Sequence, residues 1–256
     1  MLLMTHIVLG YPSFEDSLRI AAAMVEAGVD LMELQVPFSE PIADGPVILR
    51  ANQQALLHGS SVGRCVETAT ELVRRHPIPF VLMSYYNVLY RGGVDGFVQR
   101  VANAGLRGAI VPDLPPEEAS DYLAAMAKRD LDPIFIYSPN TSDARMARIA
   151  EHARGFVYCV ARKGVTGSET QLSPELVRYL SRCRAATQLP LAVGFGVKSK
   201  TDVDFLRGKA DIAVVGTESI RVIEQHGIGA IGDFIRTLRP EASPLLVSLM
   251  SDDLDS

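Results

Sequence analysis

The fold is decided by the stretch Val29-Asp30-Leu31-Met32-Glu33-Leu34-Gln35-Val36-Pro37, which predicts a short buried strand. Side chains alternate along a strand, so two sets of residues face opposite ways. One face carries Met32, Leu34 and Val36, and the other carries Leu31, Glu33 and Gln35. If helices cover the apolar face, Glu33 points into the interior that the sheet encloses. Burying a carboxylate is costly and raises its pKa, so this position predicts a residue with a partner or a chemical task.

The same alternation of short apolar runs and amphipathic stretches continues along the whole chain. Strands are predicted at 3–9, 31–36, 79–84, 108–111, 133–137, 156–160, 190–193 and 212–215. Helical patterns between them include Glu15–Ala27, Pro115–Arg129, Asp143–His152 and Pro174–Cys183. Eight strands that alternate with about eight helices over roughly 250 residues predict a single α/β (β/α)₈ TIM barrel. A doubly wound open sheet is the structural alternative.

Composition narrows the class of protein. The 256 residues carry a net charge of −5, which argues against binding to nucleic acid or to an anionic membrane. The three cysteines lack the number and spacing of a disulfide framework or a zinc site, and no metal site is predicted. Neither a signal peptide nor a run of membrane-spanning length is present, so we expect a cytoplasmic protein. We expect the barrel to occupy residues 1–240, and residues 241–256 to form a C-terminal segment ending in an acidic, disordered tail.

Glycine-bearing segments follow the last three predicted strands, where a TIM barrel places its active site. They are Gly164-Val165-Thr166-Gly167, Gly194-Phe195-Gly196 and Gly216-Thr217-Glu218-Ser219. Glycines let backbone N–H groups approach an anion, and the last segment opens a helix whose N-terminus favours phosphate. The three segments together predict a phosphate site, with ordinary turn glycines as the alternative. Glu218 would repel a phosphate and is therefore expected to point away from it.

Individual residues also have plainer interpretations. Glu33 could belong to a structural polar layer, Asp44 could be a turn residue or a helix cap, and Tyr158 could be core. Cys159 points to the opposite side of the strand from Tyr158, which predicts an inert packing residue. His6, on the first strand, could either contact a substrate or be a satisfied core histidine.

One long motif resembles a known family. The run Glu33-Leu34-Gln35-Val36-Pro37-Phe38-Ser39-Glu40-Pro41-Ile42-Ala43-Asp44-Gly45-Pro46 is similar to the signature of the tryptophan synthase alpha subunit. Further matches follow in order at Tyr85-Tyr86-Asn87, Val111-Pro112-Asp113-Leu114-Pro115 and the three glycine segments. The resemblance extends from about Ile7 to about residue 238.

The resemblance implies a lyase of tryptophan biosynthesis that cleaves indole-3-glycerol phosphate to indole and glyceraldehyde 3-phosphate. It implies Glu33 as the general acid-base residue, Asp44 as the second catalytic carboxylate and Tyr158 as a further site residue. It implies substrate and phosphate contacts from Tyr85, Thr166, Gly167, Gly194, Phe195, Gly196, Gly216 and Thr217. The implied partner is a PLP-dependent beta subunit in an alpha2beta2 heterotetramer, and no cofactor is expected in this chain.

Four features depart from the family pattern. Gln35 stands where a glycine is usual, and its amide is expected to hydrogen-bond Glu33 or to narrow the pocket. Glu40 replaces an aspartate, and His6 replaces an aromatic or apolar residue. The amphipathic helix that usually precedes the first strand has no room here, which predicts either a differently covered barrel bottom or a late start site.

Two other functional hypotheses stay open on the sequence. The chain could be a catalytically weak barrel that mainly binds and activates a beta subunit, which Gln35 and the missing helix favour slightly. It could also be a different phosphate-binding barrel enzyme, which the length of the motif opposes. No lysine on a predicted strand suggests a Schiff-base aldolase.

Overall fold

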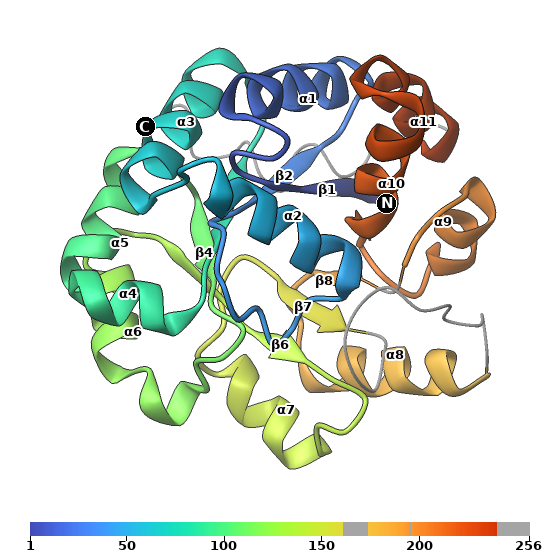
Figure 1. The fold of residues 1–256 in the computed structure, drawn as a ribbon. Coiled ribbons are helices and arrows are strands. Elements are labelled where there is room, and N and C mark those ends of the chain that lie inside the picture. The colour runs from blue at the N-terminus through green and yellow to red at the C-terminus, as the bar shows by residue number, and fades with distance from the viewer. Residues whose placement is uncertain (161–173, 195, 240–256) are drawn as a thin grey trace.

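Parallel strands form the centre of the structure, and the helices make a ring outside them (Figure 1). The computed structural model describes residues 1–160, 174–194 and 196–239. Its strands are β1 (Leu2–Val8), β2 (Leu31–Gln35), β3 (Phe80–Met83), β4 (Gly108–Ile110), β5 (Asp132–Ile134), β6 (Ile136–Tyr137), β7 (Val157–Val160), β8 (Leu191–Gly194) and β9 (Ile212–Val215).

The strands close into a barrel. Their hydrogen-bonded order is β5-β4-β3-β2-β1-β9-β8-β7-β6, and each pair is parallel. The two end strands, β5 and β6, are consecutive in sequence and only Phe135 separates them. The Phe135 carbonyl accepts the Tyr158 N–H of β7 at 2.9 Å, which bridges the junction. The prediction of a single (β/α)₈ barrel is therefore confirmed, and the open sheet is excluded.

The predicted strand at 133–137 is wrong in one respect, because it is two strands. The segment pairs with β4 through Ile134 and with β7 from Ile136 onward. The chain thus changes neighbours at Phe135, where the barrel closes. The other predicted strands are confirmed to within one residue at each end.

Helices connect the strands on the outside. They are α1 (Phe14–Glu26), α2 (Pro46–Leu57), α3 (Val62–Arg75), α4 (Tyr86–Gly92), α5 (Val94–Asn103), α6 (Ser120–Ala127), α7 (Asp143–Ala150), α8 (Pro174–Ala186), α9 (Lys200–Leu206), α10 (Thr217–His226) and α11 (Ile231–Leu238), with 3₁₀ turns η1 (Pro116–Glu118) and η2 (Ile228–Ala230). The described ranges thus hold more helices than expected, because two follow each of β2, β3 and β9. The helix predicted at 115–129 is split, since η1 ends at Glu118 and α6 begins at Ser120. Within the described part of the chain, no helix is long and apolar enough to cross a membrane.

Local sequence explains where many helices begin. The hydroxyls of Ser13, Ser61 and Ser142 accept backbone N–H groups in the first turns of α1, α3 and α7. Ser199 and Asp202 form a reciprocal capping box at the start of α9. Such caps satisfy N–H groups that have no partner within the helix, and each contributes about 1 kcal/mol.

The core has two layers that follow the strand parity. One layer lies between the strands and the helices and contains Met32 and Leu34, together with Cys159, whose predicted role in packing is confirmed. The second layer fills the barrel and contains Met4 and Leu31. Glu33 and Gln35 share the parity of Leu31, so they lie inside the barrel toward the carboxyl ends of the strands. This is the end at which barrel enzymes carry their active sites.

Candidate active site

Glu33 lies in the third position of β2 and is only 5% exposed. Its Oε2 atom has no hydrogen-bond partner among the described residues. Burial raises the pKa of this carboxyl to about 8, and the nearby charge of Asp44 contributes in the same direction. Glu33 is therefore protonated at neutral pH, although an exposed glutamate would be ionised.

Asp44 lies in the loop between β2 and α2 and turns its carboxylate inward. Its Oδ2 atom accepts a hydrogen bond from the Gln35 amide at 2.7 Å and another from the Tyr85 hydroxyl at 3.2 Å. Burial raises the pKa of Asp44 to about 6, and these two hydrogen bonds act against the rise. The residue is less solvated than its loop position suggested, yet it stays ionised at neutral pH. It does not cap α2, because Gly45 is the residue at the N-cap.

Gln35 is fully buried and joins two groups that lie far apart in sequence. Its Nε2 donates to Asp44, and its Oε1 lies 2.7 Å from the Nε2 of His6 on β1. The expectation that this amide bonds Glu33 is wrong. Glu33 and Gln35 both point inward, but the Asp44 loop folds over Gln35 and supplies the partner.

The loop that carries Asp44 is held from two sides. The Tyr85 hydroxyl accepts the Ala43 N–H at 3.1 Å while it donates to Asp44, and the Tyr85 ring stacks on Phe38 with centroids 5.1 Å apart. Asn52 of α2 is fully buried, and its Oδ1 accepts the Phe38 N–H at 2.9 Å. Tyr85 therefore positions the loop, and its predicted substrate contact stays a prediction.

Two of these anchors were missed from the sequence. Phe38 lies within the quoted motif, but nothing in its spacing indicates a stacking partner 47 positions away. Asn52 could have been found as a polar residue on the buried face of an amphipathic helix, between the buried residues Ala51 and Ala55.

Tyr158 of β7 lies inside the barrel beside the two acids. Burial raises its pKa well above the usual value, and the charges of Glu33 and Asp44 add to the effect. A Cβ on Gly194 would lie 2.7 Å from the Tyr158 hydroxyl, so only glycine leaves room for this ring. The structure thus brings Glu33, Asp44 and Tyr158 together, while Gly194 makes space for the tyrosine.

The predicted phosphate residues lie at the same end of the barrel where they are described. Gly196 follows β8 with a φ of +82°, and Gly216 directly precedes α10. A Cβ on Gly216 would lie 3.6 Å from the His6 ring, which brings this loop beside the His6–Gln35–Asp44 contacts. Glu218 forms an ion pair with Arg221 at 3.1 Å, which offsets its charge. Thr166, Gly167 and Phe195 lie outside the described residues, and phosphate binding stays a prediction.

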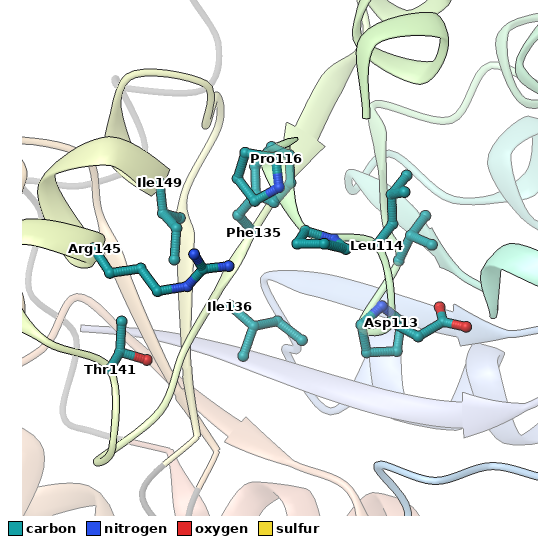
Figure 2. A pocket seen from close by; sticks show the side chains of 11 residues that line it. Asp113, Leu114, Pro116, Phe135, Ile136, Thr141, Arg145 and Ile149 are labelled. Atoms are coloured by element: carbon teal, nitrogen blue, oxygen red, sulfur yellow. The ribbon is translucent and has the colours of Figure 1, made fainter. Parts of the chain in front are cut away.

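A separate cavity of about 190 Å³ opens between the segment after β4 and α7 (Figure 2). Its lining includes the charged residues Asp113 and Arg145 but none of the predicted catalytic residues. Both charged groups are already bonded, since Asp113 accepts the Tyr86 N–H at 2.8 Å and Arg145 donates to both oxygens of Glu117. We therefore place the candidate site at Glu33 rather than here. Among the described residues, no cluster of three or more His, Cys, Asp or Glu could hold a metal ion.

Comparison with known proteins gives one consistent answer. The family model for the tryptophan synthase alpha chain matches residues 1–238. A tryptophan synthase alpha chain from Syntrophotalea carbinolica is 61% identical over 238 residues, which cover 93% of this chain and 94% of the relative. A Mycobacterium tuberculosis tryptophan synthase structure is similar with a TM-score of 0.86 and 35% identity, covering 93% of this chain and 90% of the other. A tryptophan synthase complex from Pyrococcus furiosus also gives a TM-score of 0.86, at 29% identity, and covers 93% and 97% of the two chains.

Proposed function

This chain belongs to the tryptophan synthase alpha chain family, and we propose that it cleaves indole-3-glycerol phosphate to indole and glyceraldehyde 3-phosphate. The observation that carries the proposal is that one barrel mouth holds a buried Glu33 carboxyl and an Asp44 carboxylate that accepts two hydrogen bonds, which gives the two groups pKa values of about 8 and about 6. A carbon–carbon cleavage of this kind needs one group that gives a proton and one that stabilises positive charge. Two carboxyl groups in unlike environments supply both.

Glu33 moves the protons. Its carboxyl group donates a proton to C3 of the indole ring, which leaves the ring cationic. The carboxylate then accepts the proton of the hydroxyl on the adjacent side-chain carbon. As that O–H bond breaks, the carbonyl of the aldehyde forms, the carbon–carbon bond to C3 breaks, and its electron pair neutralises the ring. Glu33 ends the cycle protonated again, and proton transfer of this kind contributes roughly 100- to 10,000-fold to rate.

Asp44 stabilises the cationic ring. Its ionised carboxylate can accept a hydrogen bond from the indole N–H, which becomes more acidic as the ring gains positive charge. A buried site strengthens this attraction, because less water screens the charges. Tyr158, packed beside both acids, limits the space that the ring can occupy.

The substrate phosphate is proposed to bind at the glycine loops. The α10 N-terminus at Gly216 and Thr217 offers N–H groups, and Gly194 and Gly196 let the backbone approach closely. On family resemblance we include Thr166, Gly167 and Phe195 in this assignment, and Tyr85 as a substrate contact. We propose no cofactor for this chain, because proton transfer and charge stabilisation suffice for the cleavage.

We also propose a tryptophan synthase beta subunit as the partner, in an alpha2beta2 assembly in the cytoplasm. Family membership and the similarity to a solved tryptophan synthase complex support a beta-subunit partner. The beta subunit would bind PLP and receive the indole. The pairing of Glu33 with Asp44 favours a working lyase over a barrel that only activates its partner.

Glu33→Gln tests the proposal directly. The amide keeps the volume of the side chain but cannot donate and recover a proton at neutral pH, so indole release should fall at least about 100-fold. Substrate binding should persist, because the phosphate loops are untouched. Indole release is measured with and without a beta subunit, and calorimetry follows binding of indole-3-glycerol phosphate. Turnover of the variant at the wild-type rate would refute the role of Glu33, and a folded wild type that releases no indole in either condition would refute the proposed function.

A further inference from the structure

The side chains of His6, Gln35 and Asp44 form a continuous hydrogen-bonded chain across two strands and a loop. His6 Nε2 lies 2.7 Å from Gln35 Oε1, and Gln35 Nε2 lies 2.7 Å from Asp44 Oδ2. His6 is 5% exposed and Gln35 is fully buried. The chain arises because β1 pairs with β2 in parallel, with His6 beside Glu33, so that inward side chains of the two strands are neighbours.

The direction of these hydrogen bonds is fixed by chemistry. An ionised carboxylate only accepts, so the NH₂ group of Gln35 must face Asp44. The Gln35 carbonyl oxygen must then face His6. Since this oxygen can only accept a hydrogen bond, His6 Nε2 must carry the proton and donate it. Turning the amide over would place two acceptors, the Gln35 carbonyl oxygen and the Asp44 carboxylate, 2.7 Å apart.

Burial and the hydrogen-bond chain together fix the charge and the tautomer of His6. Burial lowers the pKa of His6 to about 4, so the ring is neutral near pH 7. A neutral ring with its proton on Nε2 has a bare Nδ1. That atom is buried without a hydrogen-bond partner among the described residues, and it faces Gly216.

We propose that His6 and Gln35 are positioning residues of this active site, which hold the Asp44 carboxylate inward and ionised through one directed hydrogen-bond chain. The inference rests on the proposed function, since Asp44 is the group that would stabilise the indole ring. It assigns a role to two residues that otherwise mark departures from the family pattern. Glycine at position 35 could not make either contact.

The hydrogen-bond chain also affects the protonation of Glu33. The charge of Asp44 is the second cause of the raised pKa of Glu33, so a group that keeps Asp44 ionised also favours the protonated acid. Among the described residues, the other titratable groups that face Asp44 are Tyr85, which donates to it, and Tyr158, whose pKa its charge raises. Neither tyrosine loses its proton near neutral pH, because burial raises the pKa of both.

The test uses Gln35→Met, His6→Phe and the double variant in the full chain. Gln35→Met keeps the length of the side chain but removes a hydrogen bond to a charged group, so kcat for indole release should fall about 10-fold or more. KM should change little, and the acidic limb of the pH–kcat/KM profile should move to higher pH. His6→Phe should give a smaller loss, and the double variant should match Gln35→Met, because His6 acts only through Gln35. Gln54→Met, on the exposed face of α2, is the matched control and should behave as the wild type.

Two outcomes would overturn the proposal. One is wild-type kcat and pH profile in a folded Gln35→Met protein. The other is a double variant whose loss equals the product of the two single losses, which would show that His6 acts on its own.

A nitrogen-15 NMR measurement on the wild type is independent of both activity and variant folding. It should show the His6 ring, assigned by its loss in His6→Phe, neutral and protonated on Nε2 between pH 6 and 8. A proton on Nδ1 would reject the chain. If the wild type releases no indole but shows this tautomer, the proposed function fails while the hydrogen-bond chain stands.

Discussion

Glu33 and Asp44 are chemically similar residues whose surroundings give them different protonation states. Glu33 has a buried carboxyl with one oxygen that no described residue hydrogen-bonds, whereas Asp44 receives two hydrogen bonds that favour its charge. Desolvation raises the pKa of Glu33 to about 8 and that of Asp44 to about 6. The rise is smaller for Asp44 because the hydrogen bonds that Gln35 and Tyr85 donate to it lower its pKa. Near pH 7 the site therefore holds one proton that it can give and one negative charge.

This difference predicts a bell-shaped pH dependence for kcat/KM of indole release. Activity should rise as pH increases through about 6, because Asp44 loses its proton, and should fall above about 8, because Glu33 loses its own. The two values belong to a coupled pair and are read as apparent values. Asp44→Asn should remove the acidic limb and shift the alkaline limb to lower pH, since the charge that raises the pKa of Glu33 is gone. A profile that stays flat from pH 5 to 9 would exclude this assignment of the two acids.

At the scale of elements, α2 holds the loop that carries Asp44. Asn52 projects from the buried face of α2 to the Phe38 N–H, while its own amide donates to the Ile48 carbonyl. The loop is therefore tied to a regular element at one end and to Tyr85 at the other. Such support is needed because a catalytic group on a loop is only as well placed as its anchors.

We predict that Asn52→Leu weakens both stability and catalysis. The substitution leaves the Phe38 N–H without its acceptor, which should cost about 1–3 kcal/mol of unfolding free energy. It should also lower kcat, because Asp44 is less well placed. Urea unfolding and indole release measure the two effects, with Gln53→Leu on the exposed side of the same helix as the control. Equal behaviour of the two variants would show that α2 does not position the loop.

At the scale of the whole molecule, the barrel presents the Asp44 loop at one end. Ile42 lies two residues before Asp44 and is 71% exposed. Leu57 is 84% exposed but ends α2, which runs back from the loop for 12 residues, or about 18 Å. Ile42 therefore lies in the loop before the start of α2, and Leu57 lies at the far end of the helix.

We predict that a beta subunit contacts Ile42 and not Leu57. Ile42→Glu would place a charge in an apolar contact, so affinity for the beta subunit should fall about 10-fold or more, whereas Leu57→Glu should leave it within about twofold. Calorimetric titration of each variant with the beta subunit measures the two affinities. Equal losses, or no loss in either, would place the partner elsewhere.

The sequence by itself determined the barrel and the inward position of Glu33. Both follow from local properties: the alternation of side chains along a strand, and the spacing of apolar residues in the helices. The motif also placed Asp44 in the same site, through resemblance. The sequence did not predict the break at Phe135, where the segment stops pairing with β4 and begins pairing with β7. Strand pairing depends on which strand lies alongside, and the sequence of the segment itself does not contain that information.

Only the tertiary structure decided which groups in the site bind one another. Gln35 lies two residues from Glu33, yet its partners are 9 and 29 positions away, in the Asp44 loop and on β1. A hydrogen bond requires a donor and an acceptor within about 3 Å in a suitable orientation, and sequence spacing does not encode that distance between separate elements. The alternation of side chains along a strand fixes the face on which a side chain lies. The packing of β1, β2 and the loop after β2 selects its partner on that face.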